Sequence, residues 1–234
     1  MTGTDLGELR SVDVGGLTMA YRVAGGPAAP PMLLLHALGE GEHDWHNVLG
    51  ELAQTHRVYV PDLRGHGATD HPGRYSFELM RDDVLGFLDA LGIAKTVLIG
   101  HSLGGTVSVL LAEAAPHRVA SLILEDSPPP KPGTLDRPPL EPPDGPLPFD
   151  FAVVNAIRFQ LTHPDPAWWE QAAGIAVPTL IIGGGPESQI PQDVLAELVD
   201  RMPAATFVTI AAGHHVHRNR PAEFLSAVRD FLHP

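Results

Sequence analysis

The chain has 234 residues, of which 44% are hydrophobic, enough to bury the core of one globular domain. Its 28 acidic residues outnumber its 15 basic residues and give a formal charge of -13 at pH 7. This charge argues against a nucleic-acid surface or a basic membrane-binding patch. The sequence contains no cysteine, so disulfides, thiolate nucleophiles and cysteine-based metal sites are excluded.

Residues 1–12 have no charged start followed by an apolar stretch, and no run of the chain approaches the about 20 apolar residues that span a bilayer. We therefore expect a cytoplasmic protein that acts on a small molecule, with no membrane or nucleic-acid partner. Because no heptad pattern or apolar stripe stands out, the chain is expected to be a monomer or a homodimer.

The first predicted elements are two strands, 9–14 and 17–23, joined by Gly15-Gly16, a dipeptide that favours a β-hairpin. After the hairpin, short apolar runs alternate with helical patterns, which is typical of βαβ units and a parallel sheet. The further predicted strands are 32–35, 58–60, 97–99, 119–124, 179–182 and 206–210, and the predicted helices are 45–52, 77–91, 106–115, 192–202 and 222–232. The pattern thus predicts an α/β fold with about eight strands.

The segment 127–177 breaks this alternation. Runs of prolines in its first half forbid a regular helix or a central strand, whereas its second half has room for one or two short helices at 149–161 and 167–173. A disordered linker is the alternative, but the aromatic residues of the segment need burial. Long loops inside compact domains are usually functional, so we predict a lid inserted into a core formed by 1–126 and 178–234.

The predicted strand 97–99 runs into Gly100-His101-Ser102-Leu103-Gly104, which matches the G-x-S-x-G motif and leads into an apolar helix. The sharp turn of this motif places its serine in a strained backbone geometry, and the two outer glycines lack Cβ atoms that would collide there. The free N–H groups at the start of the helix suit a developing oxyanion, and Leu103 N–H is the first predicted donor. Ser102 is therefore the predicted nucleophile.

Through this turn and three further motifs, the chain resembles the α/β-hydrolase family over nearly its whole length. The motifs are His36-Ala37-Leu38-Gly39, Asp62-Leu63-Arg64-Gly65-His66-Gly67 and Gly213-His214. The resemblance implies an α/β-hydrolase fold, with a mostly parallel eight-stranded sheet flanked by helices, no cofactor, and Leu38 N–H as the second oxyanion donor. This chain has Ala37 where the family usually has glycine. His36 is expected to hydrogen-bond within its loop, and the turn 62–67 to be structural.

A serine nucleophile needs a base, and the ordinary histidine pKa of about 6.5 suits proton exchange at neutral pH. Of the 13 histidines, His214 follows the last predicted strand and a glycine, as the family's catalytic histidine does. His214 is therefore the predicted base, with His215 as the alternative, and His217 is predicted to be structural. No H-E-x-x-H spacing occurs around these histidines, so we predict no metal site.

Two carboxylates are candidates for the acid that orients this histidine. Glu187 lies in the loop after the strand 179–182, where the family more often has its acid, whereas Asp126 belongs to the dipeptide Glu125-Asp126 that follows the strand 119–124. Zearalenone-lactone hydrolases, which this chain resembles in that respect, have their acid at the earlier position. A short side chain at a strand end is also held more rigidly. We predict Asp126, with Glu187 as the alternative.

These residues predict a serine hydrolase that cleaves a small or medium hydrophobic carboxylic ester or lactone through an acyl-enzyme. Trp168, Trp169 and Phe159 of the lid are the predicted pocket aromatics. Serine at the turn argues against haloalkane dehalogenase or epoxide hydrolase chemistry, which needs a carboxylate nucleophile. C–C bond hydrolysis, cofactor-free haloperoxidase-like activity and a receptor-like role with little turnover are alternatives on the same residues.

Overall fold

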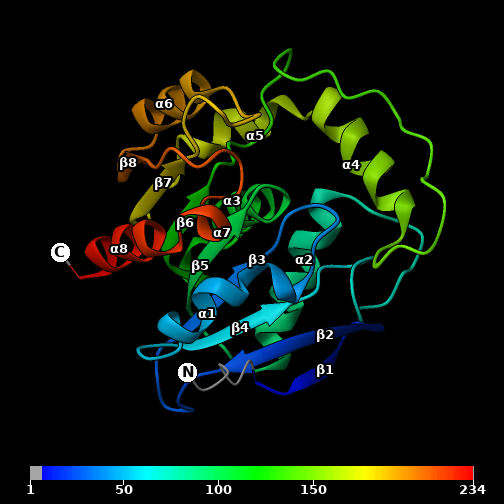
Figure 1. The fold of residues 1–234 in the computed structure, drawn as a ribbon, viewed down its shortest axis with the longest axis vertical. Helices are drawn as coiled ribbons and strands as arrows, with labels where there is room; N and C mark the ends of the chain where they lie inside the picture. Colours follow the sequence, from blue (N-terminus) through cyan, green and yellow to red (C-terminus); the bar gives the residue numbers. More distant parts are fainter. Residues whose placement is uncertain (1–6, 234) are drawn as a thin grey trace.

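The computed structural model describes residues 7–233, and an eight-stranded sheet forms its centre (Figure 1). Its strands are β1 Leu9–Val14, β2 Leu17–Ala24, β3 Pro31–Leu35, β4 Arg57–Pro61, β5 Thr96–His101, β6 Val119–Glu125, β7 Thr179–Gly183 and β8 Ala205–Thr209. Their order across the sheet is β1-β2-β4-β3-β5-β6-β7-β8. β2 pairs antiparallel with β1 and β4, and all other neighbours are parallel. The predicted mostly parallel eight-stranded sheet is confirmed.

Burial explains the sequence pattern of the strands. The interior strands β5 and β7 are buried along their whole length, so their residues form largely apolar runs. The edge strand β1 is largely exposed and turns only part of Val12 and Val14 inward. The turn after β1 needs two left-handed residues, which Gly15 (φ 60°) and Gly16 (φ 90°) provide.

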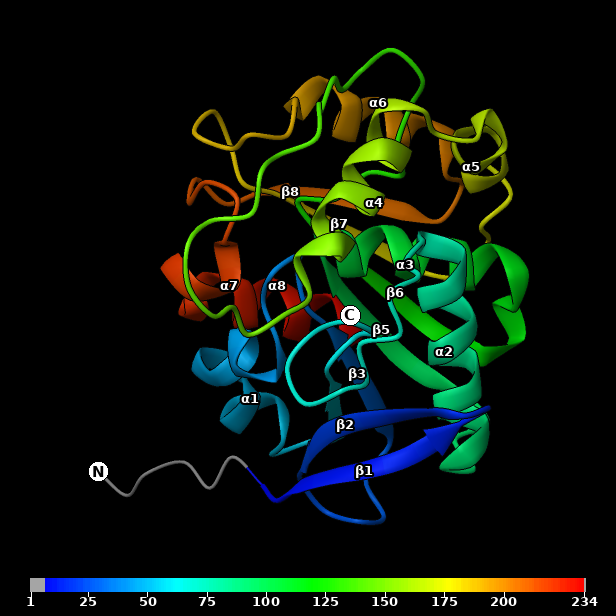
Figure 2. The ribbon, with the colours of Figure 1, turned by 90° about the vertical axis from the view of Figure 1, so that its right-hand side faces the viewer.

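Helices cover both faces of the sheet (Figure 2). They are α1 His46–Leu52, α2 Phe77–Ala90, α3 Leu103–Ala114, α4 Phe151–Thr162, α5 Pro166–Ala172, α6 Gln192–Arg201, α7 Val216–Asn219 and α8 Pro221–Leu232, with 3-10 turns η1 Glu42–Trp45 and η2 Pro116–Arg118. α2, α3 and α6 contribute to one hydrophobic core, and α1 and α8 to the other. Within residues 7–233, no helix combines the length and apolar character that crossing a membrane requires.

The differences from the predicted elements are local. The short elements η1, η2 and α7 were not predicted, because three or four residues are too few to show a helical period. α3 begins at Leu103, three residues before its predicted start at Thr106. The predicted start was late because Gly104 and Gly105 are poor helix formers. Both glycines are required by packing: a Cβ at Gly104 would collide with Leu35, and one at Gly105 with Ser127.

The segment 127–177 lies between β6 and β7 and contains α4 and α5. Before α4 it runs as irregular backbone, apart from an isolated bridge between His66 and Phe149. Asp150 caps α4 and also accepts a hydrogen bond of 2.6 Å from Tyr75 Oη. Figure 1 shows α4 and the preceding loop at the outer edge of the molecule, whereas α5 packs against α3.

Candidate active site

Ser102 occupies a tight turn between β5 and α3. Its φ of 52° and ψ of -114° are a conformation that side-chain-bearing residues rarely adopt. A Cβ at Gly100 would collide with the carbonyl of Gly104, and one at Gly104 with the carbonyl of Leu35. The backbone of the turn therefore packs too closely against neighbouring backbone for any residue other than glycine at these two positions, as the motif predicts. Ser102 itself lines a cavity at the carboxyl ends of the central strands.

Asp126 and His214 meet at the same end of the sheet. His214 Nδ1 lies 2.7 Å from Asp126 Oδ2. The Asp126 side chain is fully buried, and the His214 side chain is 10% exposed. Ser102 (φ 52°) and Asp126 (φ 48°) are the two non-glycine residues with positive φ in the described part of the chain. Backbone strain of this kind is concentrated at functional sites.

Asp126 is held by several donors besides His214. The Ser188 hydroxyl donates to Oδ2, while Gly184 N–H at 2.9 Å and Gln192 Nε2 at 3.2 Å donate to Oδ1. Burial alone would raise the pKa of the Asp126 carboxyl, but the hydrogen bonds from His214 and these groups outweigh it and hold the pKa below its ordinary value. The carboxylate is therefore ionised and fixed in orientation.

Glu187, the alternative acid, lies away from this arrangement. Its side chain is exposed, and within residues 7–233 it forms no hydrogen bond or ion pair with His214. The loop after β7 supports the site in another way, since its next residue, Ser188, donates to Asp126. The structure thus brings Asp126, and not Glu187, to His214.

The predicted nucleophile and base lie on adjacent loops. The ring of His101, the residue before Ser102, has its centroid 4.8 Å from that of His214. In the described chain, no hydrogen bond links Ser102 Oγ to His214, a contact that commonly tightens when substrate binds. Leu103 is the first residue of α3, where the helix leaves its N–H unpaired, and both Leu103 and Leu38 line the Ser102 cavity.

His36 and the turn 62–67 support the loop that contains Leu38. His36 is fully buried, its Nδ1 lies 2.8 Å from the Ala37 carbonyl, and its Nε2 accepts from Leu63 N–H at 2.9 Å. Burial lowers the pKa of His36, as expected for a neutral ring in this role. Asp62 accepts backbone N–H groups of both neighbouring loops. The predicted bonding of His36 extends beyond its own loop to the turn.

The cavity beside Ser102 has a volume of about 180 Å³. Most of its wall is apolar, and α4 contributes Ile157 and Leu161 on one side while Val194 of α6 contributes on another. Phe77, at the start of α2, is an aromatic residue of the wall that the sequence did not single out. A largely apolar cavity with a few polar groups at one point is typical of a small-molecule site.

The three predicted pocket aromatics do not line this cavity. Phe159 is 64% exposed and stacks on His163, because it lies two residues, about 200°, around α4 from Ile157. Trp168 packs edge-on against Phe77, with ring centroids 5.6 Å apart. Trp169 is buried in the core beneath Lys131 and Arg201. The prediction was wrong because it did not fix which helix face meets the cavity.

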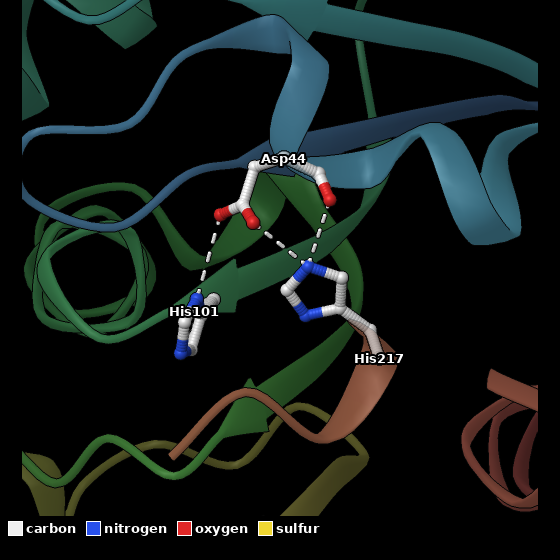
Figure 3. A group of neighbouring side chains, drawn as sticks. All are labelled: Asp44, His101 and His217. Carbon is white, nitrogen blue, oxygen red and sulfur yellow. Dashed lines mark hydrogen bonds and ion pairs between the residues drawn. The ribbon is translucent and has the colours of Figure 1, made fainter. Parts of the chain in front are cut away.

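A buried polar cluster lies beside the Ser102 turn (Figure 3). It brings together Asp44 of η1, His101 of β5 and His217 of α7, with possible ligand atoms within 4.8 Å of one another. His217 Nε2 lies 2.9 Å from Asp44 Oδ1, and its Nδ1 lies 2.7 Å from Glu125 Oε2. The ring therefore has a carboxylate at each nitrogen.

This arrangement favours an ion-pair network over a metal site. Burial alone would lower the pKa of His217, but the charges of Glu125 and Asp44 raise it to about 10. An imidazolium has no lone pair for a metal, and Arg218 Nε also lies 2.6 Å from Asp44 Oδ1. His101 Nε2 lies 2.7 Å from the His214 carbonyl, which connects the network to the predicted base.

His215, the alternative base, lies beside this network without a carboxylate partner among the described residues. Burial lowers the pKa of His215, and its ring centroid is 5.1 Å from that of His101. Asp44 was missed in the sequence because it lies in a 3-10 turn without a motif. His217 was predicted there to be structural, but its pairing with Glu125 is a contact over 92 positions.

Comparisons with known proteins agree with this geometry. Residues 30–145 match the sequence profile of the alpha/beta hydrolase fold. Over 118 residues the chain is 40% identical to epoxide hydrolase 4 of Homo sapiens. This matched region covers 49% of this chain and 33% of that protein. The chain thus spans 33% of the length of the first curated relatives it matches.

Two further relatives match over nearly the whole chain. The sn-1-specific diacylglycerol lipase ABHD11 of Mus musculus is 27% identical over 268 residues, covering 95% of this chain and 87% of that protein. The crystal structure of the enol-lactonase from Burkholderia xenovorans LB400 is 26% identical, with a TM-score of 0.76 over 96% of this chain and 100% of that chain. With its strand order, strained serine turn and matched profile, the chain belongs to the α/β-hydrolase fold family.

Proposed function

We propose that this chain is a serine hydrolase that cleaves a small or medium carboxylic ester or lactone, with Ser102 as nucleophile, His214 as base and Asp126 as acid. The single observation that most supports the proposal is the 2.7 Å contact between His214 Nδ1 and Asp126 Oδ2, beside a serine in strained conformation. A buried, ionised carboxylate fixes the ring so that its other nitrogen is free to take a proton.

The proposed reaction has two acyl-transfer steps. Ser102 Oγ attacks the carbonyl carbon as His214 takes its proton, and the N–H groups of Leu38 and Leu103 stabilise the oxyanion. The C–O bond then breaks, and His214 returns the proton to the leaving alcohol. Water, activated by the same histidine, hydrolyses the acyl-enzyme and regenerates the serine.

The relatives support hydrolysis, and the residue at the turn supports acyl transfer through a serine. Epoxide hydrolase 4 is among the matches, yet opening an epoxide through an alkyl-ester intermediate requires a carboxylate nucleophile. This chain has the hydroxyl of Ser102 at that position. The diacylglycerol lipase and the enol-lactonase are named for ester and lactone substrates, which a serine nucleophile suits.

The segment 127–177 is proposed to be a lid that sets the substrate's size and shape. Its α4 supplies Ile157 and Leu161 to the cavity wall, and Gln160 Oε1 accepts from Phe77 N–H at 2.8 Å, joining α4 to the start of α2. A wall built largely from apolar side chains favours an acyl group with a hydrocarbon body.

The test is hydrolysis of a p-nitrophenyl ester panel, from acetate to octanoate, by the wild-type chain and by Ser102→Ala. We expect turnover by the wild type, with an optimum at short or medium chain length, and loss by at least about 10³-fold in the variant. Labelling by a fluorophosphonate probe, with the adduct mapped by peptide mass spectrometry, identifies the nucleophile independently of the ester chosen.

Circular dichroism of Ser102→Ala must match the wild type, so that loss of activity reflects the missing hydroxyl. Equal turnover by both proteins, or an adduct on another residue, would refute Ser102 as the nucleophile. No turnover of any ester or lactone, together with no adduct, would refute a serine hydrolase and favour a ligand-binding member of the family.

A further inference from the structure

The largely apolar cavity beside Ser102 is also lined by three basic residues, Lys131, Arg137 and Arg158. Asp126 is the one acid among its described lining residues, and its oxygens already accept from His214 and other donors. This balance is the reverse of the whole chain, which has 28 acidic and 15 basic residues. Among the described residues, positive charge is therefore concentrated at the cavity that the proposed nucleophile lines.

Lys131 is neutralised within the protein. Its Nζ lies 2.8 and 2.6 Å from the two carboxylate oxygens of Glu197, and it sits over the ring of Trp169, 5.1 Å from the centroid. An ammonium group held by both oxygens of one carboxylate has little attraction left for a second anion. The uncompensated charge of the cavity therefore belongs to the two arginines.

Arg137 and Arg158 have no carboxylate partner in the part of the chain that the structure describes. Two hydrogen bonds hold their segments together: Arg158 Nε donates to the Pro138 carbonyl at 2.7 Å, and Arg137 N–H donates to Thr162 Oγ1 at 2.8 Å. The head group of Arg158 is therefore fixed beside the residue that follows Arg137. Both side chains are half-buried, where solvent and salt screen charge less than at a free surface.

Two positively charged side chains that line one cavity favour the binding of an anion in it. A guanidinium offers parallel N–H donors that match the two oxygens of a carboxylate, which makes either arginine a suitable partner for one. The apolar residues that line the same cavity, Ile157 and Leu161 among them, suit a short methylene chain.

We propose that the acyl group of the substrate ends in a carboxylate, which Arg137 and Arg158 bind while Ser102 attacks the ester or lactone carbonyl at the other end. The substrate class is then a half-ester of an aliphatic dicarboxylic acid, or a lactone that bears a carboxylate. This inference rests on the proposed hydrolase function and specifies its substrate.

The reaction balances without any further reactant than water. Ser102 Oγ forms a bond to the carbonyl carbon and the bond to the leaving oxygen breaks, with the serine proton passing through His214 to that oxygen. Water then supplies a hydroxyl group to the acyl carbon and a proton to Ser102. The products are a dicarboxylate and an alcohol from a half-ester, or a single hydroxy-dicarboxylate from a lactone, and the carboxylate on the arginines is unchanged throughout.

The experiment compares two p-nitrophenyl esters of glutaric acid, one with the second carboxyl free and one with it methylated. The wild type is expected to have a kcat/KM about 10- to 100-fold higher for the free carboxylate, the range for hydrogen bonds to a charged group. In Arg137→Gln and Arg158→Gln, this ratio between the two esters is expected to fall toward one. Arg229→Gln on the exposed face of α8 removes the same charge outside the cavity, and we expect it to leave both rates unchanged.

Each outcome decides the inference separately from the proposed function. Turnover of both esters at similar rates in the wild type, lost in Ser102→Ala, would overturn the carboxylate site and leave the hydrolase intact. Arginine variants that slow both esters equally, with the ratio unchanged, would overturn it too, because they would show a structural role for the arginines. If neither ester is cleaved and no ester or lactone of the wider panel is cleaved either, both proposals fall.

Discussion

Glu125 and Asp126 are consecutive residues at the end of β6, and each binds a histidine from the segment between β8 and α8. Glu125 Oε2 lies 2.7 Å from His217 Nδ1, and Asp126 Oδ2 lies 2.7 Å from His214 Nδ1. Both pairs therefore join a carboxylate to a histidine Nδ1, have the same N···O distance, and lie at nearly the same place in the fold.

The second ring nitrogen distinguishes the two pairs. His217 Nε2 faces the Asp44 carboxylate and carbonyl in a fully buried setting, so the ring is an imidazolium with both protons held. His214 has its Nδ1 on Asp126, and no hydrogen bond is formed by its other ring nitrogen within residues 7–233. A carboxylate–histidine pair is thus structural when both nitrogens are bound, and available for proton transfer when one is free.

Asp126→Asn is the sharpest test of the reactive pair. An amide cannot hold the histidine with the right proton placement or stabilise its charged form, so we expect kcat/KM for the preferred ester to fall by about 10³- to 10⁴-fold. The measurement is steady-state kinetics at neutral pH, with thermal unfolding to show that the variant is folded.

Glu187→Gln is the matched control, because it makes the same type of change in the other candidate acid. Its side chain is exposed and does not contact His214 in the described structure, so we expect a kcat/KM within about threefold of the wild type. The reverse result, a large loss with Glu187→Gln and a small one with Asp126→Asn, would show that the pair seen here is not the one used in turnover.

His217→Gln tests the structural pair. Removing the imidazolium leaves the buried carboxylates of Asp44 and Glu125 facing each other, and we expect the free energy of unfolding to fall by about 3–5 kcal/mol. Urea unfolding followed by tryptophan fluorescence measures this loss. His215→Gln, in the same loop without a carboxylate partner in the described chain, should cost less than about 1 kcal/mol.

The difference in unfolding free energy between wild type and His217→Gln should depend on pH. The folded pKa of about 10 lies above the ordinary value of 6.5, so the contribution of His217 is fully present below pH 6.5 and is lost as the pH rises toward 10. The difference should therefore shrink by at most about 1.4 kcal/mol per pH unit across that window. A difference that grows with pH would show that His217 is neutral in the folded chain.

The fold could be predicted almost completely from the sequence, because each long element has a pattern of its own. The alternation of buried strands and amphipathic helices identifies every strand from β1 to β8, and Gly15-Gly16 identifies the hairpin turn. The serine turn could be predicted because its steric requirements select glycine at Gly100 and Gly104. A backbone conformation that only certain residues can adopt can therefore be predicted from the residues at that place in the sequence.

The rest of the site depends on contacts between distant segments, which no local pattern records. Asp44 meets His217 across 173 positions, and nothing in η1 signals that contact. The cavity wall likewise depends on how α4 is rotated, which is why Ile157 lines it and Phe159 does not. Arg137 and Arg158 are 21 positions apart, and the sequence does not show that the segment 127–177 places both on one cavity.

Ser188→Ala is expected to have a smaller effect than either histidine–carboxylate test. The Ser188 hydroxyl donates to Asp126 Oδ2, the oxygen that also binds His214, so we expect it to position the proposed acid. Its removal leaves Asp126 with three donors, and we expect kcat/KM to fall about 10-fold. Ser188→Thr retains a hydroxyl and should restore most of that loss, which a purely steric role would not predict. An alanine variant as active as the wild type would show that His214, Gly184 and Gln192 hold Asp126 in place without the Ser188 hydroxyl. The proposed catalytic pair, Asp126 and His214, would then not depend on a hydrogen bond from Ser188.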